Sequence, residues 1–262
     1  MDTKISPFQC LIESRFDKTY ILNMVNRPDR RELIEYQFKE MGLELPDTGS
    51  NYFRYYYGTT FPHNALIANA FNQSGKGRFT KANEYDCARN HYAIVKICYE
   101  LGCKHCLVLE DDILFLTDIA TISEYIQQMP LDYDICQFGA FTYQPEIKKY
   151  TENTDAYWVM HPTSGLWNCS MYALSRKGME FYLAFMDKMF WVADGPLYKA
   201  VLNPCLVNTY VSRIPIVIQA DKRQMASDIR DESNDKIDYA TENQYEQGIS
   251  LNDYFAIPAS DK

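Results

Sequence analysis

The sequence predicts an α/β protein organised around one sheet, and three observations carry that prediction. Short apolar runs of the length of buried strands alternate with segments whose apolar residues recur at helical spacing. Glycine stands where two of the longer helical segments should end. The chain has 262 residues, of which 47% are hydrophobic and 23% are charged, so it can form one large domain with a sizeable core.

The N-terminal part of the chain predicts a strand followed by a helix. Residues 19–24 (TYILNM) form a short apolar run, typical of a buried strand. Pro28 suits the first turn of the helix that follows, and Gly42 should end it. Residues 52–57 (YFRYYY) predict a second strand, and residues 58–80 are expected to form a loop.

Helices and strands alternate through the middle of the chain, with elements expected at residues 82–102, 104–112, 121–129 and 133–140. The first is a helix with one apolar face, ended by Gly102. The third is a short helix capped near Thr121 or Ser123. The second and fourth are apolar runs that predict strands.

The C-terminal half is less regular, with segments expected at residues 144–155, 156–160, 170–190 and 208–220. The first is a polar connector, and the second a strand on a smaller sheet. The third predicts a strand and a helix capped by Ser175, and the fourth one or two strands. Residues 221–262 are polar and predict a C-terminal arm, with residues 1–262 forming a single domain.

Charge and hydropathy exclude several classes of function. A net charge of −9 argues against broad nucleic-acid binding, which needs a basic face. The sequence contains no run of about 18 apolar residues, so no transmembrane helix is predicted. Any membrane contact would be peripheral. The first residues, MDTKISPFQC, lack the apolar stretch of a signal peptide. We therefore expect a cytoplasmic protein.

The eight cysteines are expected to be thiols in that compartment. Cys98, Cys103 and Cys106 have a spacing found in some iron–sulfur proteins, and Cys136 could be a fourth ligand. However, Cys98 falls in a helical pattern and Cys106 in a strand, whereas a cluster needs ligands on a surrounding loop. Buried thiols are the favoured interpretation.

Three consecutive acids, Glu110, Asp111 and Asp112, end the strand at residues 104–112. Two like charges about 4 Å apart repel by roughly 4 kcal/mol at an effective dielectric near 20, so the acids need water, cationic partners or a metal. Ligands of open α/β sheets bind at such strand ends. The acids could form a solvated turn, or they could bind a hard cation that holds a substrate diphosphate.

Several motifs stand in order between about residues 18 and 230: YILNMVNRPDRRELIEYQFKEMGL, TKANEYDCARNHYAIVK, CLVLEDDILF, YALSRKGMEFYL, ADGPLY and PIVIQADKRQMASDI. In this order they resemble glycosyltransferase family 25, which includes bacterial lipopolysaccharide glycosyltransferases and procollagen galactosyltransferase domains. The resemblance implies a GT-A-like, Rossmann-type sheet that binds a nucleotide sugar. It also implies metal-dependent, inverting transfer of a hexose such as galactose from a UDP-sugar to a saccharide acceptor, in lipopolysaccharide or other surface-glycan synthesis.

By this resemblance the acidic motif would hold Mn²⁺ or Mg²⁺. Asp112 is the first candidate for direct contact with the metal, and Glu110, two residues away, lies on the same side of the strand. Asp111 would point to the opposite strand face but could still reach the donor if the chain turns. Inversion requires a base that takes a proton from the acceptor hydroxyl. Asp194, a single acid in an apolar stretch before Gly195 and Pro196, is the candidate base, or it caps the following helix.

Further candidates flank these acids. Arg27, Arg30 and Arg31 follow the first strand, and one of them could meet a phosphate or ribose, with Arg27 and Arg31 our choices. Each could instead lie on a solvated helix face. Asn23, near the strand end, could contact the uracil or ribose.

Glu84 and His91 occupy family-motif positions two helical turns apart, so they share a helix face. His91 could contact the ligand or be a core histidine. Ser227 and Asp228, where the family closes its site, could bind the acceptor or form a turn.

The chain departs from the family at Asn83, Asp86 and Asn90, which replace two glycines and a serine. These departures keep a non-catalytic nucleotide-sugar or glycan-binding protein as an alternative. A nucleotidyltransferase is a third hypothesis, since it also uses strand-end carboxylates and a metal.

Overall fold

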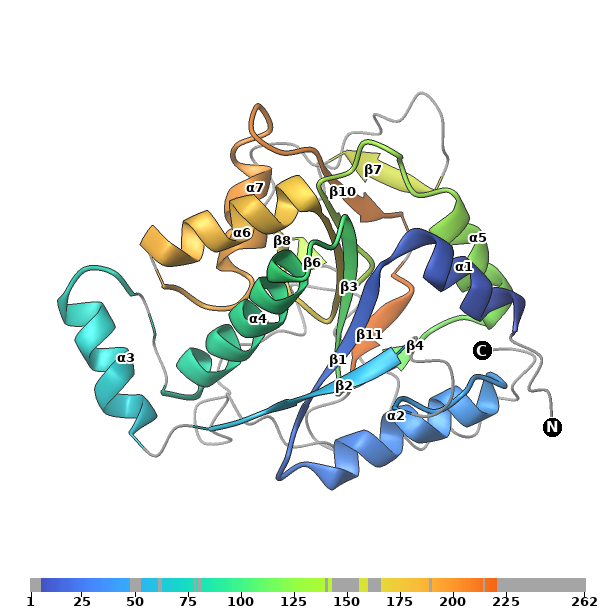
Figure 1. Cartoon of the computed structure of the whole chain (residues 1–262), viewed down its shortest axis with the longest axis horizontal. Coiled ribbons are helices and arrows are strands. Elements are labelled where there is room, and N and C mark those ends of the chain that lie inside the picture. The colour runs from blue at the N-terminus through green and yellow to red at the C-terminus, as the bar shows by residue number, and fades with distance from the viewer. Residues whose placement is uncertain are drawn as a thin grey trace.

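The computed structural model describes residues 6–47, 53–60, 63–77, 79, 82–139, 141–142, 156–159, 166–188, 190–213 and 215–220. Its centre is a seven-stranded sheet in the order β2-β1-β3-β9-β5-β10-β7 (Figure 1). These strands are β1 Lys18–Met24, β2 Phe53–Gly58, β3 His105–Glu110, β5 Ile135–Gln137, β7 Tyr157–Val159, β9 Met171–Ser175 and β10 Thr209–Ser212. Two small two-stranded sheets pair β4 Ile113–Phe115 with β11 Val217–Gln219, and β6 Phe141–Thr142 with β8 Leu166–Trp167.

Helices cover both faces of the main sheet, as Figure 1 shows. They are α1 Pro7–Arg15, α2 Pro28–Glu40, α3 Asn64–Gln73, α4 Ala82–Glu100, α5 Ile119–Gln127, α6 Arg176–Lys188 and α7 Gly195–Val201. Side chains alternate across β3 because its residues point to opposite faces. Leu107 and Leu109 join a core with α1, α2 and α5, whereas Cys106 and Val108 join a core with α4, α6 and α7. The fold is therefore an α/β protein with a three-layer arrangement.

Strand direction sets the position of the functional edge. β1 pairs in parallel with both β2 and β3, with Leu22 opposite Glu110. The carboxyl ends of these strands therefore lie at the same edge of the sheet. β9 runs antiparallel between β3 and β5, so its amino end reaches that edge. Glu110 N donates to Ser170 O at 2.8 Å, which ties the entry to β9 to the end of β3.

Most predicted elements are confirmed. The strands at β1, β2, β3 and β5 and the helices α2 and α4 occupy the expected segments. Gly42 and Gly102 follow α2 and α4 with φ of 66° and 77°, in the left-handed region that ends a helix. Ser175 caps α6, since its Oγ accepts from Gly178 N at 3.1 Å. The late segment 208–220 contains two strands, β10 and β11.

The predicted loop at residues 58–80 is wrong, because it contains the ten-residue helix α3. Six of its ten residues are apolar, and the loop prediction arose from the turn-forming segment NQSGKGR at residues 72–78, which overlaps the end of the helix. Phe71 of α3 stacks on Tyr85 of α4 with ring centroids 5.7 Å apart. α3 therefore combines a helix-forming composition with tertiary contact to α4.

Three smaller expectations also need correction. α5 begins at Ile119 with Asp118 as its cap, and Asp118 Oδ1 accepts from Thr121 N at 2.8 Å. β7 is not on a smaller sheet, because it pairs antiparallel with β10 at the edge of the main one. β3 ends at Glu110, so Asp111 and Asp112 lie in a bend before β4. The connector at 144–155 and the arm at 221–262 lie outside the described residues.

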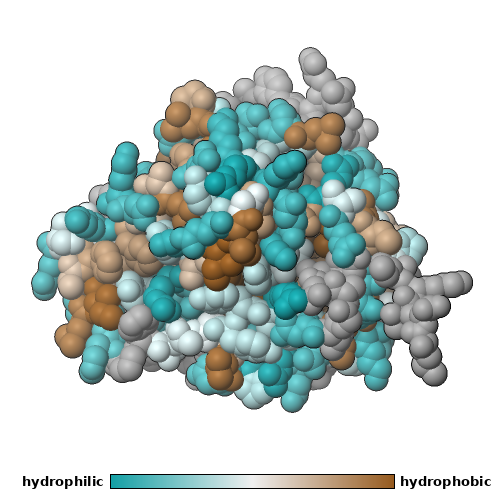
Figure 2. Space-filling model, in the orientation of Figure 1, coloured by the Kyte–Doolittle hydropathy of each residue, from teal (hydrophilic) through white to brown (hydrophobic). Residues whose placement is uncertain are grey.

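The surface seen in Figure 2 is largely hydrophilic, with apolar residues in small separate groups. Within the described ranges, none of the helices has the length and apolar character needed to cross a bilayer.

Candidate active site

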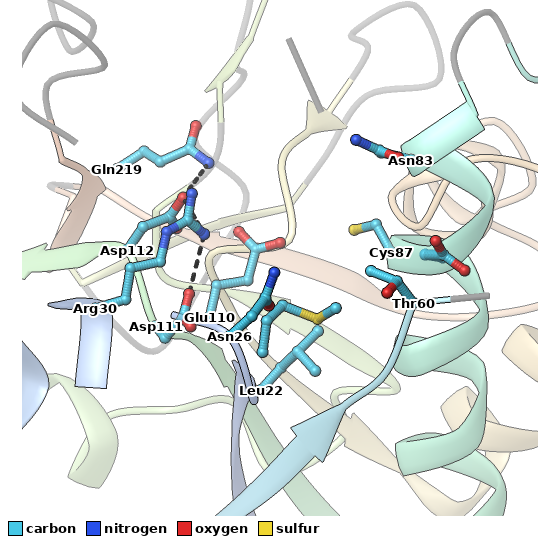
Figure 3. A pocket seen from close by; sticks show the side chains of 12 residues that line it. Leu22, Asn26, Arg30, Thr60, Asn83, Cys87, Glu110, Asp111, Asp112 and Gln219 are labelled. Carbon is cyan, nitrogen blue, oxygen red and sulfur yellow. Dashed lines mark hydrogen bonds and ion pairs between the residues drawn. The ribbon is translucent and has the colours of Figure 1, made fainter. Parts of the chain in front are cut away.

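A pocket with a volume of about 190 Å³ opens at the carboxyl ends of β1 and β3 (Figure 3). In Figure 3 the Asp111, Asp112 and Arg30 side chains lie on one side, and Asn83 and Cys87 of α4 lie on the other. The full lining is Leu22, Met24, Asn26, Arg30, Thr60, Asn83, Asp86, Cys87, Glu110, Asp111, Asp112 and Gln219. The fold thus brings all three predicted acids to one pocket.

Arg30 bridges the two aspartates. Its Nη1 lies 3.1 Å from Asp111 Oδ1 and 3.1 Å from Asp112 Oδ2, and all three side chains are buried. Gln219 Nε2 also donates to Asp112 Oδ2, at 3.2 Å. Gln219 reaches this position because β11 pairs with β4, directly after the bend that carries the acids. A fixed cation therefore offsets the repulsion between neighbouring carboxylates.

The acidic pair nevertheless ionises less readily than ordinary aspartates. Burial, followed by the charge of Asp112, raises the pKa of Asp111 to about 7 against the opposing effect of Arg30. Burial also raises the pKa of Asp112, again opposed by Arg30. Both shifts follow from desolvation, which disfavours the charged form. Added positive charge in the pocket would favour the ionised pair.

Of the three arginines after β1, Arg30 is the one that reaches the pocket. It shares the buried face of α2 with Leu33, Ile34, Gln37 and Phe38, at the spacing of a helix stripe. Arg27 instead bonds Asp29, with Nη2 2.7 Å from Oδ2. Arg31 is partly exposed and lies 3.7 Å from Glu35.

Asn23 is buried and lies behind the acids. Its Nδ2 donates to Asp111 Oδ2 at 2.7 Å and to Arg27 O at 3.1 Å. It is not among the described residues that line the pocket. Its observed contacts therefore orient Asp111.

Glu110 has contacts different from those of the two aspartates. Its Oε1 lies 3.2 Å from His91 Nε2 and accepts from Cys169 Sγ at 3.3 Å. His91 is fully buried, and its Nδ1 lies 2.9 Å from the hydroxyl of Tyr172. The three acids are thus divided: Asp111 and Asp112 pair with arginine, while Glu110 joins a histidine and a thiol.

Mutual contacts in this second group shift the pKa of each partner. Burial opposes ionisation of Glu110, but the hydrogen bond and charge of His91 hold the pKa of Glu110 below its ordinary value. Burial would lower the pKa of His91, whereas hydrogen bonds to Cys87 and Glu110 raise it. The hydrogen bond from Cys169 is the main cause that lowers the pKa of Cys87.

The first turns of α4 form the opposite wall. Asp86 is 2% exposed, and its Oδ2 accepts from Asn64 Nδ2 at 2.9 Å. Asn90 is buried and its Nδ2 lies 3.4 Å from Thr59 O. Glu84 is half-buried in the first turn and is not among the described lining residues. The departures at Asn83 and Asp86 thus add polar groups to the pocket itself.

Asp194 stands at the N-cap position of α7, but its side chain makes no capping bond. Its Oδ2 accepts from Asn168 N at 3.0 Å, and Asn168 has a φ of 100°. Burial raises the pKa of Asp194 to about 6, with a smaller contribution from the charge of Glu110. Asp194 therefore lies beside the Glu110 group, although it is not among the described residues that line the pocket.

Asp112 provides a test of whether a hard cation fits. Its Oδ1 is buried and has no hydrogen-bond partner among the described residues. A carboxylate oxygen in this state costs free energy that a cation would recover. Asp112 therefore fits a Mn²⁺ or Mg²⁺ ion, whereas Glu110 is already bonded to His91 and Cys169. Ser227 and Asp228 lie outside the described residues.

Comparison with known proteins identifies a family match over most of the chain. Residues 16–194 match the model of glycosyltransferase family 25 (LPS biosynthesis protein). A procollagen lysyl hydroxylase and glycosyltransferase from Acanthamoeba polyphaga mimivirus is 27% identical over 168 residues, 58% of this chain and 18% of the relative. A glycosyltransferase 25 family member from Drosophila melanogaster is 26% identical over 184 residues, 66% of this chain and 29% of the relative. The chain thus spans less than a third of either curated relative.

Solved structures give weaker similarity. Mannose-1-phosphate geranyltransferase from Thermus thermophilus has a TM-score of 0.36 and 14% identity, over 74% of this chain and 73% of that chain. Mouse xyloside xylosyltransferase 1, in its apo form, has a TM-score of 0.32 and 10% identity, over 72% of each chain. TM-scores at this level support no conclusion about activity.

Proposed function

The chain belongs to glycosyltransferase family 25, and we propose that it transfers a hexose, galactose in our expectation, from a UDP-sugar to a saccharide acceptor with inversion. The acceptor would belong to lipopolysaccharide or another surface glycan, and the reaction would take place in the cytoplasm. The observation that supports this proposal best is the acidic pocket at the carboxyl ends of β1 and β3, where the family's acidic motif meets Arg30.

Donor binding would use the wall formed by Arg30 and Asp112. Arginine pairs well with phosphate oxygens, so Arg30 is suited to the diphosphate. Asp112 would hold Mn²⁺ or Mg²⁺ through Oδ1, supported at Oδ2 by Arg30 and Gln219. A bound divalent cation would supply Lewis-acid stabilisation of the UDP leaving group. Asn23 would keep Asp111 oriented toward the same pocket.

Asp194 is proposed to accept the proton of the acceptor hydroxyl. A general base works best when its pKa lies near the operating pH, and burial raises the pKa of Asp194 to about 6. The bond from Asn168 N to Oδ2 fixes the carboxylate, which makes no capping bond to α7.

Two variants separate these roles. Asp112→Asn should abolish Mn²⁺-dependent binding of UDP, measured by calorimetry with and without the ion. Asp194→Asn should bind UDP and Mn²⁺ like the unaltered protein but lose transfer by about 10²–10⁴-fold, the usual contribution of general-base catalysis. Equal losses of binding and transfer in both variants would contradict this division of roles.

Product analysis distinguishes the proposed reaction from the alternatives. The protein is incubated with a panel of nucleotide sugars, Mn²⁺ and saccharide acceptors, and released UDP and pyrophosphate are measured. UDP released together with a lengthened acceptor supports transfer. Pyrophosphate released from a nucleoside triphosphate and a sugar phosphate would indicate a nucleotidyltransferase. Donor binding without turnover would indicate a binding protein, for which the polar replacements at Asn83 and Asp86 would be the first residues to examine.

A further inference from the structure

Four side chains with metal-binding atoms lie close together at the wall of the pocket: Cys87, His91, Glu110 and Cys169. The ligand atoms of Cys87, His91 and Glu110 all lie within 4.8 Å of one another. Cys169 Sγ lies 3.6 Å from His91 Nε2 and 3.3 Å from Glu110 Oε1. His91 Nε2 and Glu110 Oε1 are 3.2 Å apart. This set combines two sulfurs, one nitrogen and one oxygen.

The distances among His91, Glu110 and Cys169 suit a tetrahedral site. Zinc binds sulfur at about 2.3 Å and nitrogen or oxygen at about 2.0–2.2 Å, so ligand atoms at tetrahedral vertices are about 3.3–3.8 Å apart. The three measured edges, 3.2, 3.3 and 3.6 Å, fall in or beside this range. Cys87 Sγ lies within 4.8 Å of the ligand atoms of His91 and Glu110, so it can reach an ion that they hold.

Secondary structure holds the four ligands from three directions. Cys87 and His91 are four residues apart on α4, a spacing that places two ligands on one helix face. Glu110 ends β3, and Cys169 precedes β9. The bond from Glu110 N to Ser170 O fixes the Cys169 segment against the strand end. The arrangement therefore depends on the core of the fold.

The surroundings also match those of a metal site. A ligating histidine usually has its other ring nitrogen bonded to an outer partner, and His91 Nδ1 lies 2.9 Å from the buried Tyr172 hydroxyl. Cys87 and Glu110 line the pocket, which gives an ion a path from solvent. The ligand set, distances, outer partner and entry path are the features required of a proposed metal site.

We propose that Cys87, His91, Glu110 and Cys169 bind a borderline-soft divalent ion, with Zn²⁺ the best fit. Two thiolates and an imidazole favour zinc over Mn²⁺ or Mg²⁺, which prefer oxygen. Binding forms bonds to two sulfurs, one nitrogen and one oxygen. The two thiols release their protons to solvent, and His91 binds through Nε2 as a neutral imidazole whose one remaining proton is on Nδ1. With four protein ligands the site is structural.

This ion is separate from the Mn²⁺ or Mg²⁺ proposed for the donor. A zinc-bound Glu110 would leave Asp112 as the acid available to the diphosphate-binding ion. The zinc would also lock α4 to β3 and β9, and so fix one wall of the donor pocket. The proposal rests on the cluster's geometry, and its test requires neither donor nor acceptor, so its failure would not affect the transfer experiments.

Cobalt titration tests the site directly. Co²⁺ occupies zinc sites and shows thiolate-to-metal charge-transfer absorption. The reduced, chelator-treated protein should bind one Co²⁺ with this absorption, and one equivalent of Zn²⁺ should displace it. Cys169→Ser should lower the affinity more than about a hundredfold, since even changes to outer-shell partners cost roughly 10–100-fold.

Cys106→Ser is the matched control. Cys106 is buried like Cys169 but belongs to a different group of thiols, with Cys98 and Cys103. Cys106→Ser should bind Co²⁺ like the unaltered protein, with circular dichroism confirming that both variants are folded. No charge-transfer absorption in the unaltered protein would overturn the proposal, whether or not the variants fold. Loss of the absorption in Cys106→Ser but not in Cys169→Ser would overturn it as well.

Discussion

Arg30 shows how one side chain permits two adjacent carboxylates to be buried. Removing one member of a buried charge group leaves the others without compensation, and this costs far more than the net contribution of the intact group. Arg30 contacts both Asp111 and Asp112 at 3.1 Å. Arg31, one position on, pairs with Glu35 at a partly exposed surface. The two neighbours therefore provide a direct comparison.

Arg30→Gln should lower the free energy of unfolding by about 3–5 kcal/mol. Arg31→Gln should change it by no more than about 1 kcal/mol, as expected for an exposed pair. Urea unfolding measures both. The loss in Arg30→Gln should be smaller at pH 5 than at pH 8, since Asp111, with a pKa of about 7, is protonated at the lower pH. Similar losses in the two variants would contradict the role assigned to Arg30.

Asp194 should link pH to stability and to activity in opposite senses. Its pKa is about 6 in the folded protein against an ordinary 3.8, so the folded state binds more protons than the unfolded state between these values. The free energy of unfolding therefore falls as pH rises through this window, and the cost persists above it. Transfer, which needs the ionised base, should increase over the same interval.

Asp194→Asn should raise the melting temperature at pH 8, leave it unchanged below about pH 4, and lower transfer by about 10²–10⁴-fold. Asp187→Asn is the control, because Asp187 is an exposed acid on α6 that accepts from Tyr92. The control should change neither property. Thermal melts from pH 4 to 8, with initial rates at each pH, test the prediction. A destabilised Asp194→Asn at pH 8 would argue for a purely structural carboxylate.

Local sequence could predict part of the site but not its long-range contacts. The strand-end acids and His91 stand in recognisable segments, and the structure brings them together. Arg30 could also have been found, since it continues the buried stripe through Leu33 and Ile34. Cys169 and Gln219 reach the acids only through the pairing of β9 and β11, and no local pattern reports that pairing.

At the scale of elements, α6 is packed unusually closely against the sheet. Gly178 lies in its first turn, and a Cβ at this position would come within 1.9 Å of Asp134 O. Helix propensity alone favours alanine over glycine by about 1 kcal/mol. Packing and propensity therefore predict opposite signs for the same substitution.

Gly178→Ala should lower the free energy of unfolding by about 3 kcal/mol, at the upper end of overpacking costs. Gly102→Ala is a contrasting change, because Gly102 has a φ of 77° and open space around its Cα. It should cost only about 1–2 kcal/mol through backbone strain. Denaturant titration compares them. A stabilised Gly178→Ala would show that α6 can shift away from β5 without loss.

Helices and strands were predictable where the spacing of the apolar residues agreed with the residues that end an element. β3 and α4 have both an apolar pattern and a terminating signal, and they lie where expected. α1 carries a capping box between Ser6 and Gln9, a local signal from which this helix is predictable. α3 has six apolar residues of ten and packs Phe71 against Tyr85, but turn-forming residues overlap its C-terminal end. Two local signals conflict there, and the contact with α4 that favours the helix is not encoded in the local sequence.

At the scale of the whole molecule, one sheet joins strands from the N-terminal half of the chain to strands from the C-terminal half. β3 pairs with β9, and β9 pairs in turn with β5. Neither part can separate without breaking the centre of the sheet and both of its hydrophobic cores. We therefore expect the chain to unfold as one unit, in keeping with a single domain.

Two optical probes test this expectation. All three tryptophans, Trp158, Trp167 and Trp191, belong to the C-terminal half of the chain, whereas helices in both halves contribute to circular dichroism. Tryptophan fluorescence and far-ultraviolet circular dichroism should give the same urea midpoint. A fluorescence transition at lower urea concentration than the loss of helix would indicate that the C-terminal half unfolds separately.

The placement of β9 also has a consequence for synthesis on the ribosome. Sixty residues separate Glu110 from Met171, so β3 emerges long before the strand that covers its edge. At roughly 5–20 residues per second, that edge waits about 3–12 s for its neighbour. A nascent chain in this interval exposes an apolar strand to other proteins, and molecular chaperones that bind extended apolar segments would act at this stage.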